Sequence, residues 1–239
     1  MTQTIGPEIA YRVPDWLASD TEESVVGTEW HQEAIGALAD MLRDVADRRG
    51  AAWGVCEQVA LIGLQHVNGT DYDPRPDVMV LPRPLPRGSM ASVRLAAIGA
   101  PLLIAEMASD STKGNDQGEK RLAYAAIGVA EYLVFDPGGE ILSAPLHAWR
   151  LQGDAYAPWE PDSDGWWRSA ALDVAFRIAQ PLLNVRDRDG TVIEPSGLVR
   201  RRARELEQRL RAQAEERGAL EQRLADLERQ LRELRAEEG

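Results

Sequence analysis

Three ionisable residues, Asp77, Glu106 and Lys120, stand where strands should end or where a core should be apolar. Asp77 opens the apolar run 77–81, Glu106 comes near the end of the run 102–107, and Lys120 lies one turn into a helical segment. Two carboxylates at the ends of adjacent strands can hold one Mg²⁺, which takes oxygen ligands and keeps most of its waters. A lysine beside it can orient a water and stabilise charge on a phosphate. Together these residues indicate metal-assisted hydrolysis of a phosphodiester.

Each of the three residues also has a purely structural interpretation. Asp77 could be a turn residue that starts a strand, Glu106 could pair with an arginine, and Lys120 could be a solvated helix residue. Taken singly, these structural roles are favoured. The occurrence of all three in one order of helices and strands favours the catalytic interpretation.

The elements that must position these residues follow from hydrophobic periodicity and turn signals. A helix is expected from Thr28 to Gly50, because apolar residues recur there at three- and four-residue spacing. Strands are expected over residues 55–62, 77–81, 102–107 and 131–135, with the proline-rich stretch 82–88 as a loop. A second helix should begin at Asn115 or Asp116 and end at Gly128. The order helix–strand–strand–strand–helix–strand predicts a mixed α/β core.

Residues 140–195 are expected to form a β-rich extension of this core. Four of the seven tryptophans lie in it, namely Trp149, Trp159, Trp166 and Trp167. They fit hairpins that pack against the core, and an aromatic platform facing a substrate is the less favoured alternative. Residues 28–195 would then form one domain after an irregular lead-in over residues 1–27.

Residues 197–238 have the heptad pattern of a coiled coil. Leucines follow alternating steps of four and three residues, at Leu206, Leu210, Leu220, Leu224, Leu227, Leu231 and Leu234, and Gln213 and Arg217 interrupt the seam. A lone helix of this kind would leave a leucine stripe in water, so it needs a second copy, another protein or its own body as partner. Self-association is the commonest solution, and a homodimer is expected.

Charge and composition limit the classes of function. The net charge is −12, and the near-neutral tail from Gly197 onward leaves −13 on residues 1–196, which argues against binding of nucleic acid by bulk electrostatics. The single cysteine, Cys56, excludes an internal disulfide and a cysteine metal cluster. The longest apolar run, 95–105, is too short to cross a bilayer, and no secretory signal is visible at the N-terminus. A cytoplasmic protein without membrane segments is expected.

Four stretches carry a resemblance to a known family. They are Pro76–Asp77–Val78–Met79–Val80, the run 106–112 (EMASDST), the run 116–120 (DQGEK) with Tyr124, and the run 131–137 (EYLVFDP). Together with a first helix that carries His31, they resemble the PD-(D/E)XK nuclease superfamily, and more closely its Uma-two family of restriction-endonuclease-like proteins, over residues 28–137. The resemblance implies a restriction-endonuclease-like fold, DNA as substrate, Mg²⁺ or Mn²⁺ held by Asp77 and Glu106, and catalysis assisted by Lys120.

The chain departs from the superfamily pattern at one catalytic position. The superfamily lysine stands two residues after the acidic strand residue, where this chain has Ala108. In the Uma-two pattern the following helix supplies the lysine, and Lys120 has that place. His31, Lys113 and Tyr124 are further candidates for substrate contacts, although a semi-buried His31 and a solvated Lys113 are the simpler interpretations.

Two functions from different classes remain open. The first is a divalent-metal-dependent endonuclease that cuts DNA and is dimerised by the coiled coil. The alternative is a catalytically degenerate nuclease-fold scaffold that binds a partner through its coiled coil, which Ala108 and the acidic body would favour.

Overall fold

The computed structural model describes residues 11–13, 29–66, 69–84, 91–109 and 118–195, together with residues 217, 218 and 223. The chain divides into two units, Met1–Pro195 and Ser196–Gly239. Most of the lead-in 1–27, most of the loop 82–88 and nearly all of the predicted coiled coil 197–238 lie outside the described residues. The architecture below therefore concerns the first unit.

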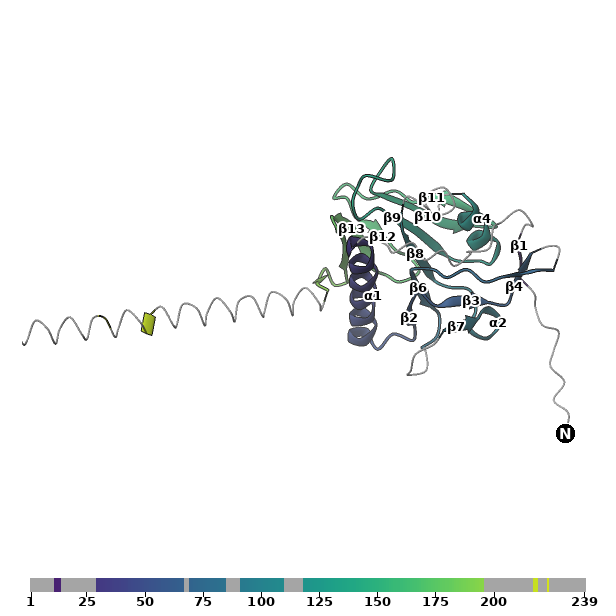
Figure 1. Ribbon diagram of the computed structural model, residues 1–239, viewed down its shortest axis with the longest axis horizontal. Coiled ribbons are helices and arrows are strands. Elements are labelled where there is room, and N and C mark those ends of the chain that lie inside the picture. The colour runs from purple at the N-terminus through teal and green to yellow at the C-terminus, as the bar shows by residue number, and fades with distance from the viewer. Residues whose placement is uncertain are drawn as a thin grey trace, which may run out of the picture. The chain divides into compact units, whose positions relative to one another are not determined.

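A six-stranded mixed sheet forms the centre of this unit (Figure 1). Its strand order is β11 (Ala155–Pro158), β10 (Leu146–Gln152), β9 (Glu131–Phe135), β8 (Leu103–Met107), β6 (Val78–Leu81) and β2 (Gly54–Glu57). β8 and β9 run parallel and the other neighbouring pairs run antiparallel. The parallel pair requires a crossover connection, and helix α4 (Glu119–Ala126) lies within it.

A second sheet follows in the chain, with the order β12 (Trp167–Arg168), β13 (Ala175–Ala179), β14 (Leu182–Arg186) and β15 (Val192–Ile193). Two small sheets complete the unit. One contains β1 (Tyr11–Val13), β4 (Leu64–His66) and β5 (Asp71–Tyr72), and the other pairs β3 (Ala60–Ile62) with β7 (Ser92–Arg94), which leads into the short helix α2 (Leu95–Ile98). The predicted mixed α/β core with a β-rich extension is confirmed.

Helix α1 (Glu29–Arg49) joins the central sheet to the second sheet. It packs on β2, β6 and β8 and also on β14 and β15, and its predicted apolar stripe is buried. At its C-terminus Arg49 donates hydrogen bonds to the carbonyl oxygens of Leu172 (2.8 Å) and Asp173 (2.6 Å) and pairs with the carboxylate of Asp187. These bonds attach the last turn of the helix to the loops of the second sheet.

Helix α4 packs on the other face of the central sheet. Its Ala123 and Tyr124, with Ile127 directly after it, share a buried cluster with alternate strand residues, namely Met79, Leu81, Ile104, Tyr132 and Val134. Because successive strand residues point to opposite faces, the intervening Val78, Val80 and Ala105 point toward α1. The three strands β6, β8 and β9 are buried along their whole length, as a sheet covered on both faces requires.

The expectation of one continuous strand over 55–62 was wrong. The chain forms β2 and β3 in different sheets, because Gln58 adopts a positive φ of 49° that turns the backbone between them. The Gln58 N–H donates to the carbonyl oxygen of Asp77 at 3.1 Å. The second helix is described from Glu119 onward, and its predicted start at Asn115 or Asp116 lies outside the described residues.

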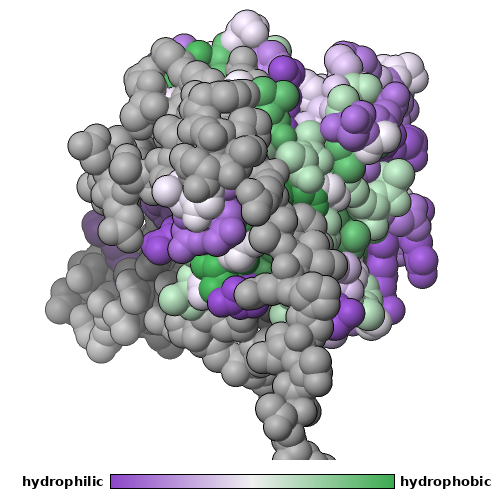
Figure 2. Space-filling view, turned by 90° about the vertical axis from the view of Figure 1, so that its right-hand side faces the viewer, coloured by the Kyte–Doolittle hydropathy of each residue, from purple (hydrophilic) through white to green (hydrophobic). Residues whose placement is uncertain are grey.

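Three of the four tryptophans of the extension, Trp149, Trp159 and Trp166, are buried, as expected for hairpin packing. Cys56 is buried as well, and burial raises the pKa of its thiol to about 11. On the face that carries β4 and α4, hydrophobic residues form narrow strips between hydrophilic groups (Figure 2). Within the described part of the chain, no helix has the length and hydropathy needed to cross a membrane.

The turn after β9 is built around the fully buried carboxylate of Asp136. Its two oxygens accept backbone N–H bonds from Gly138 (3.1 Å), Gly139 (2.8 Å), Ile141 (2.6 Å) and Leu142 (2.9 Å). A carboxylate accepts at both oxygens, whereas an amide accepts at one.

We expect Asp136→Asn to lower the free energy of unfolding by about 2–4 kcal/mol, because at a fully buried side chain it replaces one acceptor oxygen by a donor that faces two N–H groups. Urea denaturation measures the change. Asp154→Asn, in the exposed turn between β10 and β11, is the matched control and should change stability by less than about 0.5 kcal/mol. Equal stability of the two variants would contradict this account of the turn.

Candidate active site

The strand register brings Asp77 and Glu106 together. β6 and β8 are antiparallel with Val78 opposite Ala105, so Asp77 and Glu106 occupy the next position on each strand. The Asp77 N–H donates to Glu106 Oε2 at 3.3 Å, and the Met107 N–H donates to Asp77 Oδ2 at 2.7 Å. The backbone of each strand thus holds the carboxylate of the other.

Helix α4 supplies two further groups to Glu106. Lys120 and Tyr124 lie one turn apart on the same face of the helix, and both reach Glu106 Oε1, Lys120 Nζ at 3.4 Å and the Tyr124 hydroxyl at 2.8 Å. The side chains of Lys120 and Glu106 are only 6% and 3% exposed. Burial weakens solvent screening, so removing one charge would take away the oppositely charged partner of a buried group.

Aromatic packing fixes the ring of Tyr124. The ring meets Tyr132 of β9 edge to face at 5.2 Å, and Tyr132 stacks on Trp149 of β10 at 5.6 Å. Tyr132 lies on the α4 face of the sheet, as the alternation along β9 would indicate. From the sequence Tyr132 could line the cleft or have a structural role, and in the structure its ring supports Tyr124.

His31 reaches the site from the first turns of α1. Its Nε2 lies 3.7 Å from Asp77 Oδ2, and both side chains are 14% exposed. The contact occurs at the end of the sheet, where a residue of α1 can reach past the strand to the opposite face. His31 and Asp77 are therefore the more accessible members of the cluster, and Glu106, Lys120 and Tyr124 form its buried part.

The donor set fits a hard cation with few protein ligands. Asp77 Oδ1 has no hydrogen-bond partner among the described residues, and Glu106 supplies a second carboxylate beside it. The described residues contain no group of three or more His, Cys, Asp or Glu side chains that could hold a metal. Two carboxylates suit Mg²⁺, which keeps several waters, and do not suit a structural zinc site, which needs four protein ligands.

The structure brings together four of the predicted residues, Asp77, Glu106, Lys120 and Tyr124, with His31 at their edge. Tyr124 is fully buried and donates to Glu106, so its hydroxyl positions that carboxylate. Lys113 lies outside the described residues. The backbone N–H of Met107 was not foreseen, because only the strand register shows that it meets Asp77.

The central sheet thus presents two carboxylates at neighbouring strand ends beside a helix-borne lysine, as the family resemblance implied. The chain matches the model of the Uma2 family, described as "Putative restriction endonuclease", over residues 19–186, and it belongs to this family. The resemblance seen in the sequence is thereby confirmed.

A solved structure that the chain matches is a protein of the family DUF820 from Anabaena variabilis ATCC 29413, titled a "putative nuclease". It is 16% identical, the match covers 57% of this chain and 71% of that chain, and the TM-score is 0.40. Among curated proteins no match was found.

We expect Glu106 and Lys120 to be energetically coupled in EDTA. Glu106→Gln and Lys120→Met should each lower the free energy of unfolding by about 3 kcal/mol, because each removes the opposite charge from a buried ion pair. The double variant should lose at least about 1 kcal/mol less than the sum. Urea denaturation of the four proteins gives the coupling.

The exposed pair Arg168–Asp162, at 3.0 Å, is the matched control. The cycle of Arg168→Gln and Asp162→Asn should give a coupling below about 1 kcal/mol, because water screens the pair. Additive effects of the Glu106 and Lys120 variants would contradict the buried pair.

Proposed function

We propose that this protein is a divalent-metal-dependent endonuclease that hydrolyses DNA phosphodiester bonds. The observation that carries the proposal is the meeting of Asp77, Glu106 and Lys120 at the ends of β6 and β8. Membership of a family described as "Putative restriction endonuclease" supports a nuclease activity and DNA as its substrate.

Asp77 and Glu106 would hold Mg²⁺ or Mn²⁺, which when bound supplies a Lewis acid that polarises the phosphate. Lys120 carries a positive charge next to these carboxylates, where it can orient the attacking water and stabilise charge on the phosphate oxygens. Tyr124 donates to Glu106 and so holds one carboxylate oxygen in place. His31, beside Asp77 and partly exposed, can contact a phosphate oxygen or protonate a leaving group.

We expect metal-dependent cutting of plasmid DNA that is lost in Asp77→Asn, Glu106→Gln and Lys120→Met. Each variant should lose at least about 100-fold in rate, because each removes a group that acts on the reacting phosphate. The measurement is nicking of supercoiled plasmid, and cutting of single-stranded DNA, with Mg²⁺, Mn²⁺ or EDTA.

The control variant is Glu140→Gln, which removes an exposed carboxylate in the turn after β9. It should cut at the wild-type rate. A folded wild-type protein that cuts no substrate, and shows no metal binding by calorimetry, would instead support the non-catalytic scaffold, in keeping with alanine at position 108.

We also propose that residues 197–238 dimerise the protein through their leucine seam. Light scattering of the full chain at micromolar concentration should give about twice the monomer mass of 26.4 kDa. Leu220→Glu with Leu224→Glu should return the monomer mass, since charges would replace two seam leucines, whereas Glu221→Gln should not. A monomer mass for the wild-type chain would exclude the dimer.

A further inference from the structure

The outer face of the second sheet carries a group of arginines. Register places Arg168 of β12, Ala175 of β13 and Arg186 of β14 in one row across the strands, so their side chains share a face. Arg177, two residues after Ala175 on β13, lies on the same face, and Arg188 follows β14. We refer to Arg168, Arg177, Arg186 and Arg188 as the arginine face.

Trp166 holds two of these guanidinium groups in place. Arg177 lies over the buried Trp166 ring at 4.5 Å and Arg186 at 4.1 Å. Within the described part of the chain, neither guanidinium has a carboxylate partner. Two cations are thus held by stacking and keep their N–H groups for another ligand.

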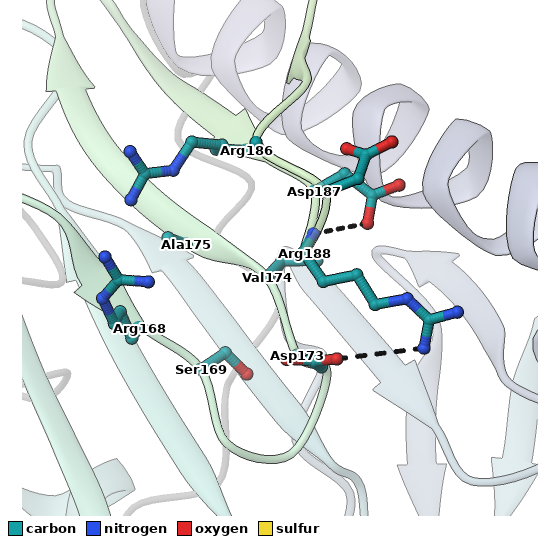
Figure 3. Close-up of a pocket in the computed structure, with 10 residues that line it drawn as sticks. Arg168, Ser169, Asp173, Val174, Ala175, Arg186, Asp187 and Arg188 are labelled. Carbon is teal, nitrogen blue, oxygen red and sulfur yellow. Dashed lines mark hydrogen bonds and ion pairs between the residues drawn. The ribbon is translucent and has the colours of Figure 1, made fainter.

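The other two members are exposed, and each has a carboxylate partner that water screens. Arg168 is 68% exposed and pairs with Asp162 at 3.0 Å, and Arg188 is 63% exposed with Asp173 4.0 Å away. A cavity of about 380 Å³ opens between Arg168, Arg186 and Arg188 (Figure 3). Three aspartates, Asp173, Asp187 and Asp189, also border the cavity. The carboxylate of Asp187 already binds Arg49 of α1, and that of Asp173 lies 4.0 Å from Arg188.

We propose that the arginine face binds the phosphodiester backbone of DNA. The inference rests on the proposed function for its ligand and assigns this face, apart from Asp77 and Glu106, as a site of substrate binding. The body carries a charge of −13, so bulk electrostatics repels a polyanion, and a local concentration of cations is needed for affinity. Arginine forks match phosphate geometry, and stacking on Trp166 orders two of them before the ligand arrives.

The test is binding of a fluorescent 20-base-pair duplex in EDTA, followed by anisotropy at several salt concentrations. Metal is left out so that binding is measured without cutting. Arg177→Gln with Arg186→Gln should weaken binding at least about 10-fold and reduce the slope of log K against log salt by about 2. The matched control, Arg83→Gln with Arg94→Gln, removes two exposed arginines elsewhere and should leave both quantities unchanged.

A second pair, Arg168→Gln with Arg188→Gln, guards against misfolding. Both side chains are mostly exposed, so this variant should melt at the wild-type temperature and still bind more weakly. If both arginine-face variants fold and bind DNA as tightly as the wild type, the proposal is wrong. The same holds if the wild type binds no duplex.

Failure of this inference is distinguishable from failure of the proposed function. Wild-type binding that both variants weaken, without cutting under any metal, would support the arginine face and reject the endonuclease. Normal cutting and DNA binding by the variants would support the endonuclease and reject the arginine face as the binding site. The variants could also keep the wild-type DNA affinity but show a lower mass than the wild type by light scattering. That result would show that the face contacts the acidic body of a second copy, and it would overturn the proposal.

Discussion

The burial of the Glu106 carboxylate is the constraint on which the rest of the core depends. A buried charge of this kind is tolerated only when fixed donors surround it, and here they come from the Asp77 backbone, Lys120 and Tyr124. The first donor requires the register of β6 and β8, and the other two require one face of α4 to point at the sheet. Strand pairing, helix orientation and the aromatic packing under Tyr124 therefore all serve one carboxylate.

Helix α1 extends this organisation to the second sheet. His31 near its start contacts Asp77, and Arg49 at its end binds Asp187 and two carbonyl groups of the loops beside it. The apolar stripe between these ends packs on strands of both sheets. One helix thus fixes the position of the arginine face relative to the central sheet, which a flexible linker could not do.

Much of the core could be predicted from the sequence, because its elements have strong local signals. The periodic helix α1, the strand β9 and the apolar runs around Asp77 and Glu106 lie where periodicity indicated. The break at Gln58 could not be foreseen, since a positive φ at glutamine has no compositional signal. The grouping of Asp77, Glu106 and Lys120 followed from spacing and family resemblance, whereas the contact of Met107 with Asp77 needed the observed register. The arginine face was missed because its residues come from three separate segments. The composition of these segments does not show which of them pair in the sheet, or in what register.

The separation of contacts along the chain has a consequence for the order of folding. Glu106 and Lys120 are 14 residues apart, whereas Arg49 and Asp187 are 138 apart. Closure of a short loop costs less chain entropy than closure of a long one, so the β8–α4 unit can assemble early. During synthesis the C-terminal turn of α1 must wait until the second sheet has left the ribosome before its arginine finds a partner. The carboxylate cluster can therefore form first, and docking of the arginine-bearing sheet completes the domain.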